Sequence, residues 1–471
     1  MEPRAIVTHG DPIAPVILGV TSILLFAIIG RVVARRLGQP TVLGELLMGI
    51  LLGNLAYYLG IDLITVLREG QSVFDVVNRT LAGAPVGEVA AEIFGVEKGA
   101  EIVRIVTGPH GGEVMQVAHT VDVFSRYGVI FLLFMVGLEN ELRDLQQVGR
   151  DAVRVAVIGV VVPFLLGMAA TVLLRPDMSM STIMFIAATL GATSVGISAQ
   201  VLHEVDQHRS RTGRIVLGAA VADDILGLMM LAIVSGIVVS GSVDLREVIF
   251  IITISALFLG SAIALGPYIV RFSAHIMRRL DLVEAKMFTS YLFVMVLAWV
   301  ANLAGLATIV GAFAAGLILS DQHFKDYEDE SGQSDRQLTI RELIMPLEVI
   351  LVPIFFILMG IQVKLESFLH WSVIVLAAGL LVAAIVGKLV SGIGAARPIN
   401  RLAVGIGMLP RGEVGLVFAA IGRTLGVLND AVFSAIVLMV VVTTLIAPPW
   451  LKHELLRQPP EADADPDARP G

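Results

Sequence analysis

The stretch Gly218-Ala-Ala-Val-Ala-Asp-Asp-Ile-Leu-Gly227 places two adjacent carboxylates, Asp223 and Asp224, near the centre of an apolar run over residues 212–240. A run of this length predicts a helix that crosses a membrane, because about 20 apolar residues span the hydrocarbon layer. Charged side chains at that depth are costly, and two neighbouring carboxylates repel each other unless a cation is close. We therefore expect Asp223 and Asp224 to form part of a functional site. A purely structural pair, held by backbone groups or a lysine, is the alternative.

The composition of the whole chain also indicates a membrane protein. It has 471 residues, of which 56% are hydrophobic and only 16% are charged, and its mean hydropathy is +0.85. Soluble domains contain about 45–50% apolar and about 25% charged residues. The apolar runs predict an all-α polytopic protein with about thirteen transmembrane helices. They lie at 14–34, 40–60, 124–142, 151–174, 180–202, 212–240, 246–272, 286–304, 306–320, 346–363, 371–394, 401–427 and 430–449.

Several classes of function are excluded by composition. The chain has no cysteine, which rules out disulfides, thiol nucleophiles and cysteine-ligated zinc or iron–sulfur sites. Its net charge of −8 argues against a nucleic-acid partner, since a phosphate-binding surface must be basic. We expect no cofactor.

The distribution of charge predicts the orientation of the helices. Arginine and lysine gather in alternate loops, beginning with Arg35-Arg36 after the first apolar run. The positive-inside rule then places the N-terminus outside and the C-terminus in the cytoplasm. The polar segment 61–123 becomes an extracytoplasmic insertion, with short amphipathic helices near residues 74–81 and 86–94. The predicted parts are 1–60 with the first transmembrane helices, the insertion 61–123, the remaining transmembrane domain 124–450, and a disordered cytoplasmic tail 451–471.

A cation is available for the two aspartates. Lys388 lies inside the predicted span 371–394, and a lysine at membrane depth requires a carboxylate partner. We expect it to pair with one of the two aspartates. Snorkelling of the lysine from a helix end is the alternative interpretation.

Two further spans carry interruptions that predict broken helices. Gly191, Thr193 and Ser194 interrupt the run at 188–198, and Pro410 removes a backbone donor within 405–415. Unwound backbone survives at membrane depth only where it is buried in protein or lines a cavity, and a pair of breaks in corresponding halves indicates a transport site. Arg411 and Glu413 are expected to neutralise each other or the exposed helix ends.

Several motifs resemble the monovalent cation:proton antiporter superfamily, in particular its second branch of bacterial sodium/proton antiporters with paired aspartates. The similarity covers nearly the whole chain outside 61–123 and the tail. The motifs are Gly38-Gln-Pro-Thr-Val-Leu-Gly-Glu-Leu-Leu-Met-Gly-Ile-Leu-Leu-Gly53, Leu132-Leu-Phe-Met-Val-Gly-Leu-Glu139, Thr189-Leu-Gly-Ala-Thr-Ser-Val-Gly-Ile-Ser-Ala-Gln-Val-Leu202, the 210–228 region around the aspartates, Phe355-Phe-Ile-Leu-Met-Gly360 and Met408-Leu-Pro-Arg-Gly-Glu-Val-Gly-Leu-Val417.

The resemblance implies a fold of two inverted repeats whose broken helices cross, with a core domain and a dimerisation domain. It implies a homodimer in a bacterial plasma (inner) membrane, working as an elevator. It makes Asp224 the ion-binding carboxylate, pairs Asp223 with Lys388, and puts Thr193 and Ser194 in the unwound stretch beside the site. An Asp-Asp pair with lysine resembles the electrogenic members.

The predicted function is secondary antiport of Na⁺ (or Li⁺) against H⁺, with both ions competing for Asp224. Oxygen ligands suit such a hard cation. If Na⁺ binding breaks the Asp223–Lys388 pair, Lys388 also loses a proton, and two protons exchange for one Na⁺. A mechanism in which both aspartates titrate and Lys388 only steadies the helix is equally compatible.

Other functions are weighed against this one. A K⁺/H⁺ antiporter or potassium efflux protein shares the fold, although the efflux proteins resembling it usually carry Gln-Asp and a C-terminal nucleotide-binding domain. A sensor or channel on the same scaffold is also open. An intramembrane aspartyl protease needs carboxylates on two facing helices, whereas adjacent aspartates on one helix diverge by about 100°. We expect no enzyme activity.

Overall fold

The computed structural model describes residues 11, 13–139, 149–207, 210–240, 245–277, 280–324 and 338–457, and these residues form helices and connecting segments without a strand. The predicted all-α architecture is confirmed. The helices are α1 Ala14–Arg36, α2 Thr41–Tyr58, α3 Asp62–Glu69, α4 Gln71–Leu81, α5 Val86–Phe94, α6 Val96–Thr107, α7 Gly111–Glu139, α9 Arg150–Leu174, α10 Met180–Thr189, α11 Val195–Glu204, α12 Arg211–Ser240, α13 Leu245–Ile276, α14 Leu282–Leu303, α15 Thr308–Ile318, α17 Ile340–Ile361, α18 Trp371–Ser391, α19 Arg401–Gly407, α20 Glu413–Thr424 and α21 Asp430–Leu456, with short 3₁₀ turns η2 Asp321–Phe324, η3 Leu365–Leu369 and η4 Gly392–Gly394.

Ten of the described helices are long and apolar enough to cross a membrane, and shorter apolar helices lie at Met180–Thr189, Thr308–Ile318 and Val414–Thr424. Together they account for the thirteen predicted spans. The two spans expected to be broken, 180–202 and 401–427, are each divided between two helices, α10–α11 and α19–α20. The span predicted at 306–320 is the short helix α15.

Polar caps and one glycine set several helix boundaries. The side chains of Ser179, Asn400 and Asn429 each accept a hydrogen bond from a backbone N–H in the first turn of α10, α19 and α21, which satisfies a donor that lacks a partner within the helix. Between α14 and α15, Gly305 takes a φ of +76°. Glycine adopts this left-handed conformation without steric cost, so the chain turns here as expected.

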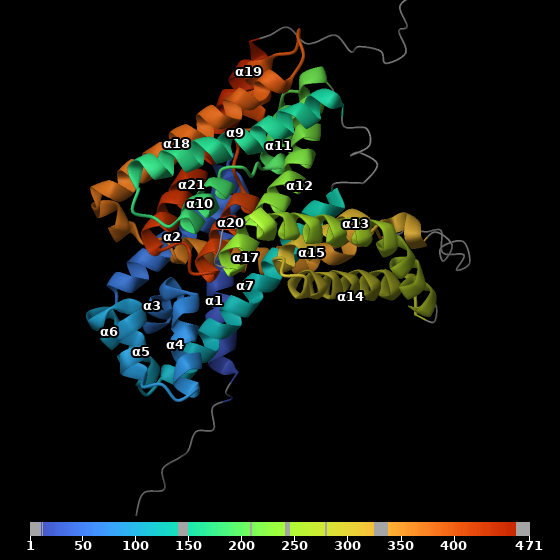
Figure 1. Cartoon of the computed structure of the whole chain (residues 1–471). Helices are drawn as coiled ribbons and strands as arrows, with labels where there is room; N and C mark the ends of the chain where they lie inside the picture. The colour runs from blue at the N-terminus through green and yellow to red at the C-terminus, as the bar shows by residue number, and fades with distance from the viewer. Residues whose placement is uncertain are drawn as a thin grey trace, which may run out of the picture. The chain divides into compact units, whose positions relative to one another are not determined.

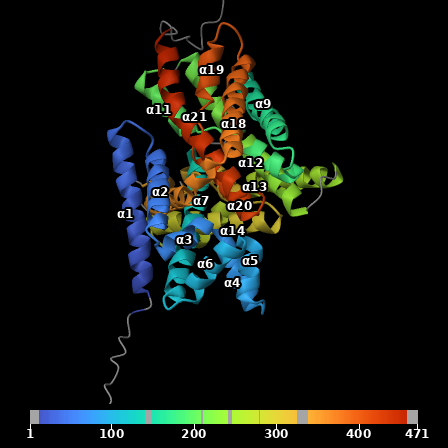
Figure 2. The ribbon, with the colours of Figure 1, turned by 90° about the vertical axis from the view of Figure 1, so that its left-hand side faces the viewer.

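The chain divides into two compact units, of which the first contains residues 1–128 and 350–364. In this unit α1 and α2 form an antiparallel pair (Figure 2). Gly30 of α1 and Gly44 of α2 face each other so closely that a Cβ on either would meet the other's carbonyl oxygen. Gly49 and Gly53 of α2 pack in the same way against residues 357–361. Small residues of this kind let membrane helices approach at the backbone.

The insertion 61–123 contains more helix than the sequence indicated. The two predicted amphipathic helices are α4 and α5, but α3 and α6 flank them, and α7 already begins at Gly111. Val76, Val89 and Ala90 form a small core of their own beneath these short helices. The polar residues at the start of α7 concealed the continuous helix, because hydropathy alone does not register the amphipathic turns that precede a membrane span.

A buried group of charges holds the short helices within this first unit. Lys364 donates to both carboxylate oxygens of Glu69 at 2.9 and 2.8 Å, and Lys98 lies 2.6 Å from the same carboxylate. Arg68, which is fully buried, donates to the side-chain oxygen of Asn54 at 2.9 Å. Burial by itself lowers the pKa of Lys98, but the Glu69 carboxylate outweighs it and holds that pKa above its ordinary value.

The second unit, residues 129–349 and 365–471, repeats one pattern twice. A long helix, a broken helix and a second long helix follow each other as α9, α10–α11 and α12, and again as α18, α19–α20 and α21. The first helices of the two sets, α9 and α18, lie side by side (Figure 1). Residues from both sets share one apolar core, including Val155, Val216 and Val404.

The C-terminal end differs from the predicted boundary at residue 451. Helix α21 continues to Leu456, because Leu451 and Leu455 are buried in the same apolar core. The remainder of the predicted tail, 458–471, lies outside the described residues.

We predict that Glu69→Gln destabilises the protein by roughly 3–5 kcal/mol, because it removes the carboxylate shared by the buried Lys364 and the partly exposed Lys98. The unfolding temperature in detergent measures the effect. Glu92→Gln is the matched control: Glu92 pairs with Arg79 at 2.7 Å with both side chains exposed, so little change is expected there. Equal stability of the two variants would contradict the structural role of the buried group.

Candidate ion-binding site

The predicted pair of Asp223 and Lys388 is present. The Nζ atom of Lys388 lies 2.9 Å from Oδ1 of Asp223, and both side chains are fully buried. Lys388 also donates to the carbonyl oxygen of Gly191 at 2.6 Å. Its side chain therefore joins α12 to the first helix break. Full burial excludes the alternative in which Lys388 snorkels to the surface.

Helix α9 forms the wall behind this pair. A Cβ on Gly159 would lie 3.5 Å from Lys388 Nζ and 3.6 Å from Asp223 Oδ1. Next to Lys388, a Cβ on Gly387 would lie 2.7 Å from the Cα atom of Pro163, which is closer than real Cβ atoms approach. The two glycines bring α9 and α18 together at the level of the buried charges.

The two helix breaks contact each other directly. The backbone N–H of Ser194 donates to the carbonyl oxygen of Pro410 at 2.8 Å, and the Thr193 hydroxyl donates to Met408 at 3.2 Å. The Ser198 hydroxyl donates to the carbonyl oxygen of Gly407 at 2.5 Å. The unwound residues are 190–194 and 408–412. Since water is absent from the hydrocarbon, these contacts satisfy backbone groups that the helices leave open.

Arg411 stabilises the contact between the two helix breaks. Its Nη1 atom donates to the carbonyl oxygens of Thr189 and Ala192 at 3.3 and 3.0 Å, and its own carbonyl oxygen accepts from the Thr444 hydroxyl. Thr189 is the last residue of α10, so this contact lies at the helix end that Arg411 is predicted to neutralise, whereas Ala192 lies in the break itself. Glu413 begins α20, but its side chain lies outside the described residues, so its predicted pairing is undescribed.

Four buried charges therefore gather within the second unit. Asp224 is 3% exposed, and Asp223, Lys388 and Arg411 are fully buried. Within the described part of the chain, Oδ2 of Asp223 and the Nε and Nη2 atoms of Arg411 have no hydrogen-bond partner. Unsatisfied buried polar atoms are rare and mark places where a ligand, water or second state completes the pairing.

The chemistry of the site favours a monovalent cation and a proton. Carboxylates, hydroxyls and backbone carbonyls supply oxygen ligands for a hard cation, and a carboxylate also accepts a proton. The described residues include no group of three histidine, cysteine or carboxylate side chains that could hold a transition metal.

Sequence reasoning missed three residues at this site. Gly159, Ser198 and Thr444 contact the buried pair or the breaks, but each looks like ordinary small-residue helix packing in the sequence. The role of Gly159 can be recognised only once the close approach of α9 to α18 is known. The serine could have been found by continuing the motif one helical turn past Ser194.

The fold and the site together define a polytopic membrane transporter whose buried ionisable group lies beside crossed helix breaks. A family model described as sodium/hydrogen exchanger, transmembrane, matches residues 99–456. The chain belongs to this family, in agreement with the resemblance of its motifs.

Similar proteins have Na⁺/H⁺ antiporter names. The chain is 35% identical to the high-affinity Na⁺/H⁺ antiporter NhaS3 of Synechocystis sp., over 93% of this chain and 90% of that protein. It is 32% identical to the Na⁺/H⁺-K⁺ antiporter GerN of Bacillus cereus, over 75% of this chain and 88% of that protein.

A solved structure has the same fold. The sodium proton antiporter MjNhaP1 from Methanocaldococcus jannaschii at pH 8 matches with a TM-score of 0.59 and 16% identity, over 94% of this chain and 100% of that chain. At this identity the similarity concerns the fold alone.

We predict that Arg411→Gln lowers the free energy of unfolding by about 3 kcal/mol, because charged hydrogen bonds to the carbonyl oxygens of Thr189 and Ala192 are lost and those acceptors stay buried. Thermal unfolding in detergent measures the loss. Arg154→Gln is the control, since Arg154 is 64% exposed and its carboxylate partner is 3.7 Å away. If Arg411→Gln were as stable as Arg154→Gln, Arg411 would not stabilise the contact between the two helix breaks.

Proposed function

We propose that this protein is a secondary active Na⁺/H⁺ antiporter in which Na⁺ and H⁺ compete for Asp224. The observation that carries the proposal is the buried Asp223–Lys388 ion pair, 2.9 Å apart, with Lys388 bound to the first of two crossed helix breaks. The names of relatives at 35% and 32% identity support the same ions.

Competition at one carboxylate explains coupling without a separate gate for each ion. Asp224 is buried next to Asp223 on α12, and Thr193 and Ser194 lie in the adjacent break. A proton or a Na⁺ ion neutralises Asp224, whereas the empty carboxylate stays charged. Moving an uncompensated charge through the hydrocarbon is costly, so only a loaded site changes sides.

The proton carried by the buried Lys388 sets the net charge that each exchange cycle moves. When Na⁺ binds at Asp224, Asp223 is drawn toward it and the bond to Lys388 weakens. Lys388 is then a fully buried ammonium group without its carboxylate, and because an uncompensated buried charge is costly, Lys388 releases its proton. Two protons leave for each Na⁺ bound, so net charge crosses the membrane. Each elementary charge is worth about 2.3 kcal/mol per 100 mV.

The division into two compact units supports a mechanism with one mobile part and one fixed part. All the ion-binding residues proposed here, namely Asp223, Asp224, Lys388, Thr193 and Ser194, fall in the second unit. We propose that this unit is the mobile core, that the protein is a homodimer, and that the first unit belongs to the fixed scaffold.

A K⁺/H⁺ exchange activity is the second candidate. It is favoured by the 32% identity to a protein named as a Na⁺/H⁺-K⁺ antiporter. Carboxylate and hydroxyl oxygens bind either ion, and the ligand types present do not select between them.

We propose a plasma-membrane protein with the N-terminus outside and the C-terminus in the cytoplasm, from the bias of arginine and lysine among the loops. Because the chain has no cysteine, a single Glu88→Cys variant reports on which side of the membrane the insertion lies. Position 88 is exposed on α5. We expect a membrane-impermeant maleimide to label it in intact cells. Labelling only after the membrane is opened would reverse the orientation.

We predict that Asp224→Asn reduces Na⁺-driven proton movement in proteoliposomes to the level of protein-free liposomes, because an amide cannot exchange a proton for a cation. A pH-sensitive dye measures the flux. Asp177→Asn, the same substitution at an exposed loop residue paired with Arg175, should retain wild-type flux. Residual exchange in a folded Asp224→Asn protein would refute the assignment, and K⁺ as effective as Na⁺ in the wild type would favour the second candidate.

We predict that Lys388→Gln retains Na⁺/H⁺ exchange but loses the associated current, because the second proton no longer has a carrier. Currents on a solid-supported membrane are compared with dye-reported flux. Lys286→Gln is the control, since Lys286 is 2% exposed and pairs with Asp321 outside the site, and its current should persist. A Lys388→Gln protein that is less stable yet still electrogenic would assign both protons to the aspartates.

A further inference from the structure

Arg411 uses only part of its guanidinium group in the contact between the helix breaks. Its Nη1 atom binds the carbonyl oxygens of Thr189 and Ala192, whereas its Nε and Nη2 atoms have no hydrogen-bond partner within the described part of the chain. The side chain is fully buried, so bulk water does not complete these bonds. A buried guanidinium with two open donors on one edge is costly unless another state of the site supplies an acceptor.

Asp223 carries the matching acceptor. Its Oδ1 atom bonds to Lys388 at 2.9 Å, and among the described residues its Oδ2 atom has no hydrogen-bond partner. The N–H groups of Nε and Nη2 on a guanidinium are parallel and fit the two oxygens of one carboxylate. The ammonium group of Lys388 is a point charge without this geometry. The free edge of Arg411 is therefore the better match for a whole carboxylate.

The two cations bind neighbouring carbonyl groups. Lys388 donates to Gly191 at 2.6 Å, and Arg411 donates to the next residue, Ala192, at 3.0 Å. The first helix break thus holds both cations on one short stretch of unwound backbone. Because a guanidinium has five donors, the Nη1 bond persists while the Nε–Nη2 edge takes a carboxylate. Arg411 need not release the break in order to bind Asp223.

The charges of the four buried groups determine when this second pairing forms. With Na⁺ at Asp224 and a neutral Lys388, the two aspartates carry two negative charges, and Na⁺ and Arg411 carry two positive charges. The sodium-loaded site is then neutral. Without the charge of Arg411, the same state would hold a net negative charge in buried surroundings, which is costly, and Lys388 would keep its proton.

We propose that Arg411 is a positioning residue for the exchange, whose Nε–Nη2 edge binds Asp223 when Na⁺ occupies Asp224. Asp223 then leaves Lys388, and the Lys388 proton passes to the water from which Na⁺ enters. When protons replace Na⁺, Asp223 returns to Lys388 and the pair seen in the structure is restored. The inference rests on the proposed exchange of two protons for one Na⁺.

The number of protons released for each bound Na⁺ tests this role on the full chain in detergent. Titration calorimetry with Na⁺, repeated in buffers of different ionisation enthalpy, gives that number. Arg411→Lys keeps a positive charge and a donor for the carbonyl oxygens of the break, but it lacks the second edge. We expect two protons from the wild type and one from Arg411→Lys, a twofold fall. Because the count is made per bound Na⁺, a smaller folded fraction does not change it.

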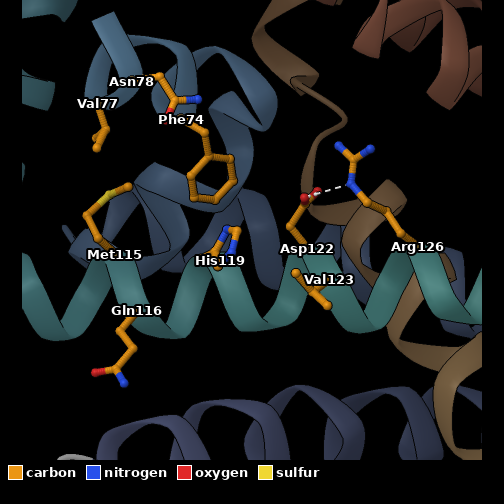
Figure 3. Close-up of a pocket in the computed structure, with 9 residues that line it drawn as sticks. All are labelled: Phe74, Val77, Asn78, Met115, Gln116, His119, Asp122, Val123 and Arg126. Atoms are coloured by element: carbon orange, nitrogen blue, oxygen red, sulfur yellow. Dashed lines mark hydrogen bonds and ion pairs between the residues drawn. The ribbon is translucent and has the colours of Figure 1, made fainter. Parts of the chain in front are cut away.

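Arg126→Lys is the matched control. Arg126 bonds through Nε to Asp122 at 2.8 Å, in the first unit, where both line a pocket of about 500 Å³ between α4 and the first half of α7 (Figure 3). This pair is partly exposed and lies outside the group of residues that binds the ion. Arg126→Lys should release two protons, as the wild type does.

A double variant shows whether Arg411 acts through Lys388. Lys388→Gln has lost the second proton and should release one. Lys388→Gln combined with Arg411→Lys should also release one, because the only proton that Arg411 controls is already absent. The unfolding temperature in detergent verifies that each variant is folded.

The outcomes separate this inference from the proposed function. Two protons from Arg411→Lys, beside two from the wild type, overturn the role of Arg411 and leave the two-proton exchange intact. A wild type that releases a single proton overturns the two-proton exchange itself. A double variant that releases no proton would show that Arg411 controls the proton of Asp224, and would also overturn the role proposed here.

Discussion

The pairing of buried charges is the constraint on which the second unit depends. Lys388 is fully buried, and in such surroundings an ammonium group requires a carboxylate and further acceptors. Asp223 supplies the carboxylate and Gly191 supplies a carbonyl oxygen. One side chain thereby connects α18, α12 and the first helix break. The positions of these three elements are linked by a contact that is costly to break without a compensating ion.

Helix breaks create the need for a second set of contacts. Each unwound segment exposes backbone groups that an intact helix would satisfy, and the two segments pair with each other instead. Gly412 permits this approach, since a Cβ there would lie 2.8 Å from the Ser194 hydroxyl. Arg411 then binds the carbonyl oxygens of Thr189, the last residue of α10, and of Ala192 in the break. Asp223 and Asp224 thus lie beside backbone whose polar groups are already matched to one another.

The first unit follows the same rule on a smaller scale. Its short helices have a core of only a few apolar residues, and Glu69 adds a buried bond to Lys98 and Lys364. A carboxylate shared by two lysines joins an insertion helix to the segment after α17. The same kind of polar residue that makes the insertion too polar to cross a membrane forms contacts that stabilise this unit.

The sequence by itself determined the class of the protein and the central residues of its site. Composition and apolar runs predicted the helices, and the cost of charge at membrane depth singled out Asp223, Asp224 and Lys388. Those signals are local, because each is read within a single helix. The role of Asp224 in ion binding is still a prediction from the family resemblance.

Only the tertiary structure decided which atoms meet. Lys388 contacts Gly191, and Ser198 contacts Gly407, across long separations in the chain. Neither contact can be predicted from the local hydropathy of the sequence. The same holds for Gly159, which matters because a neighbouring helix passes close to it. The early start of α7 and the helices α3 and α6 were missed since their residues are polar and amphipathic. Packing between distant segments, and not the pattern within any one of them, fixes these positions.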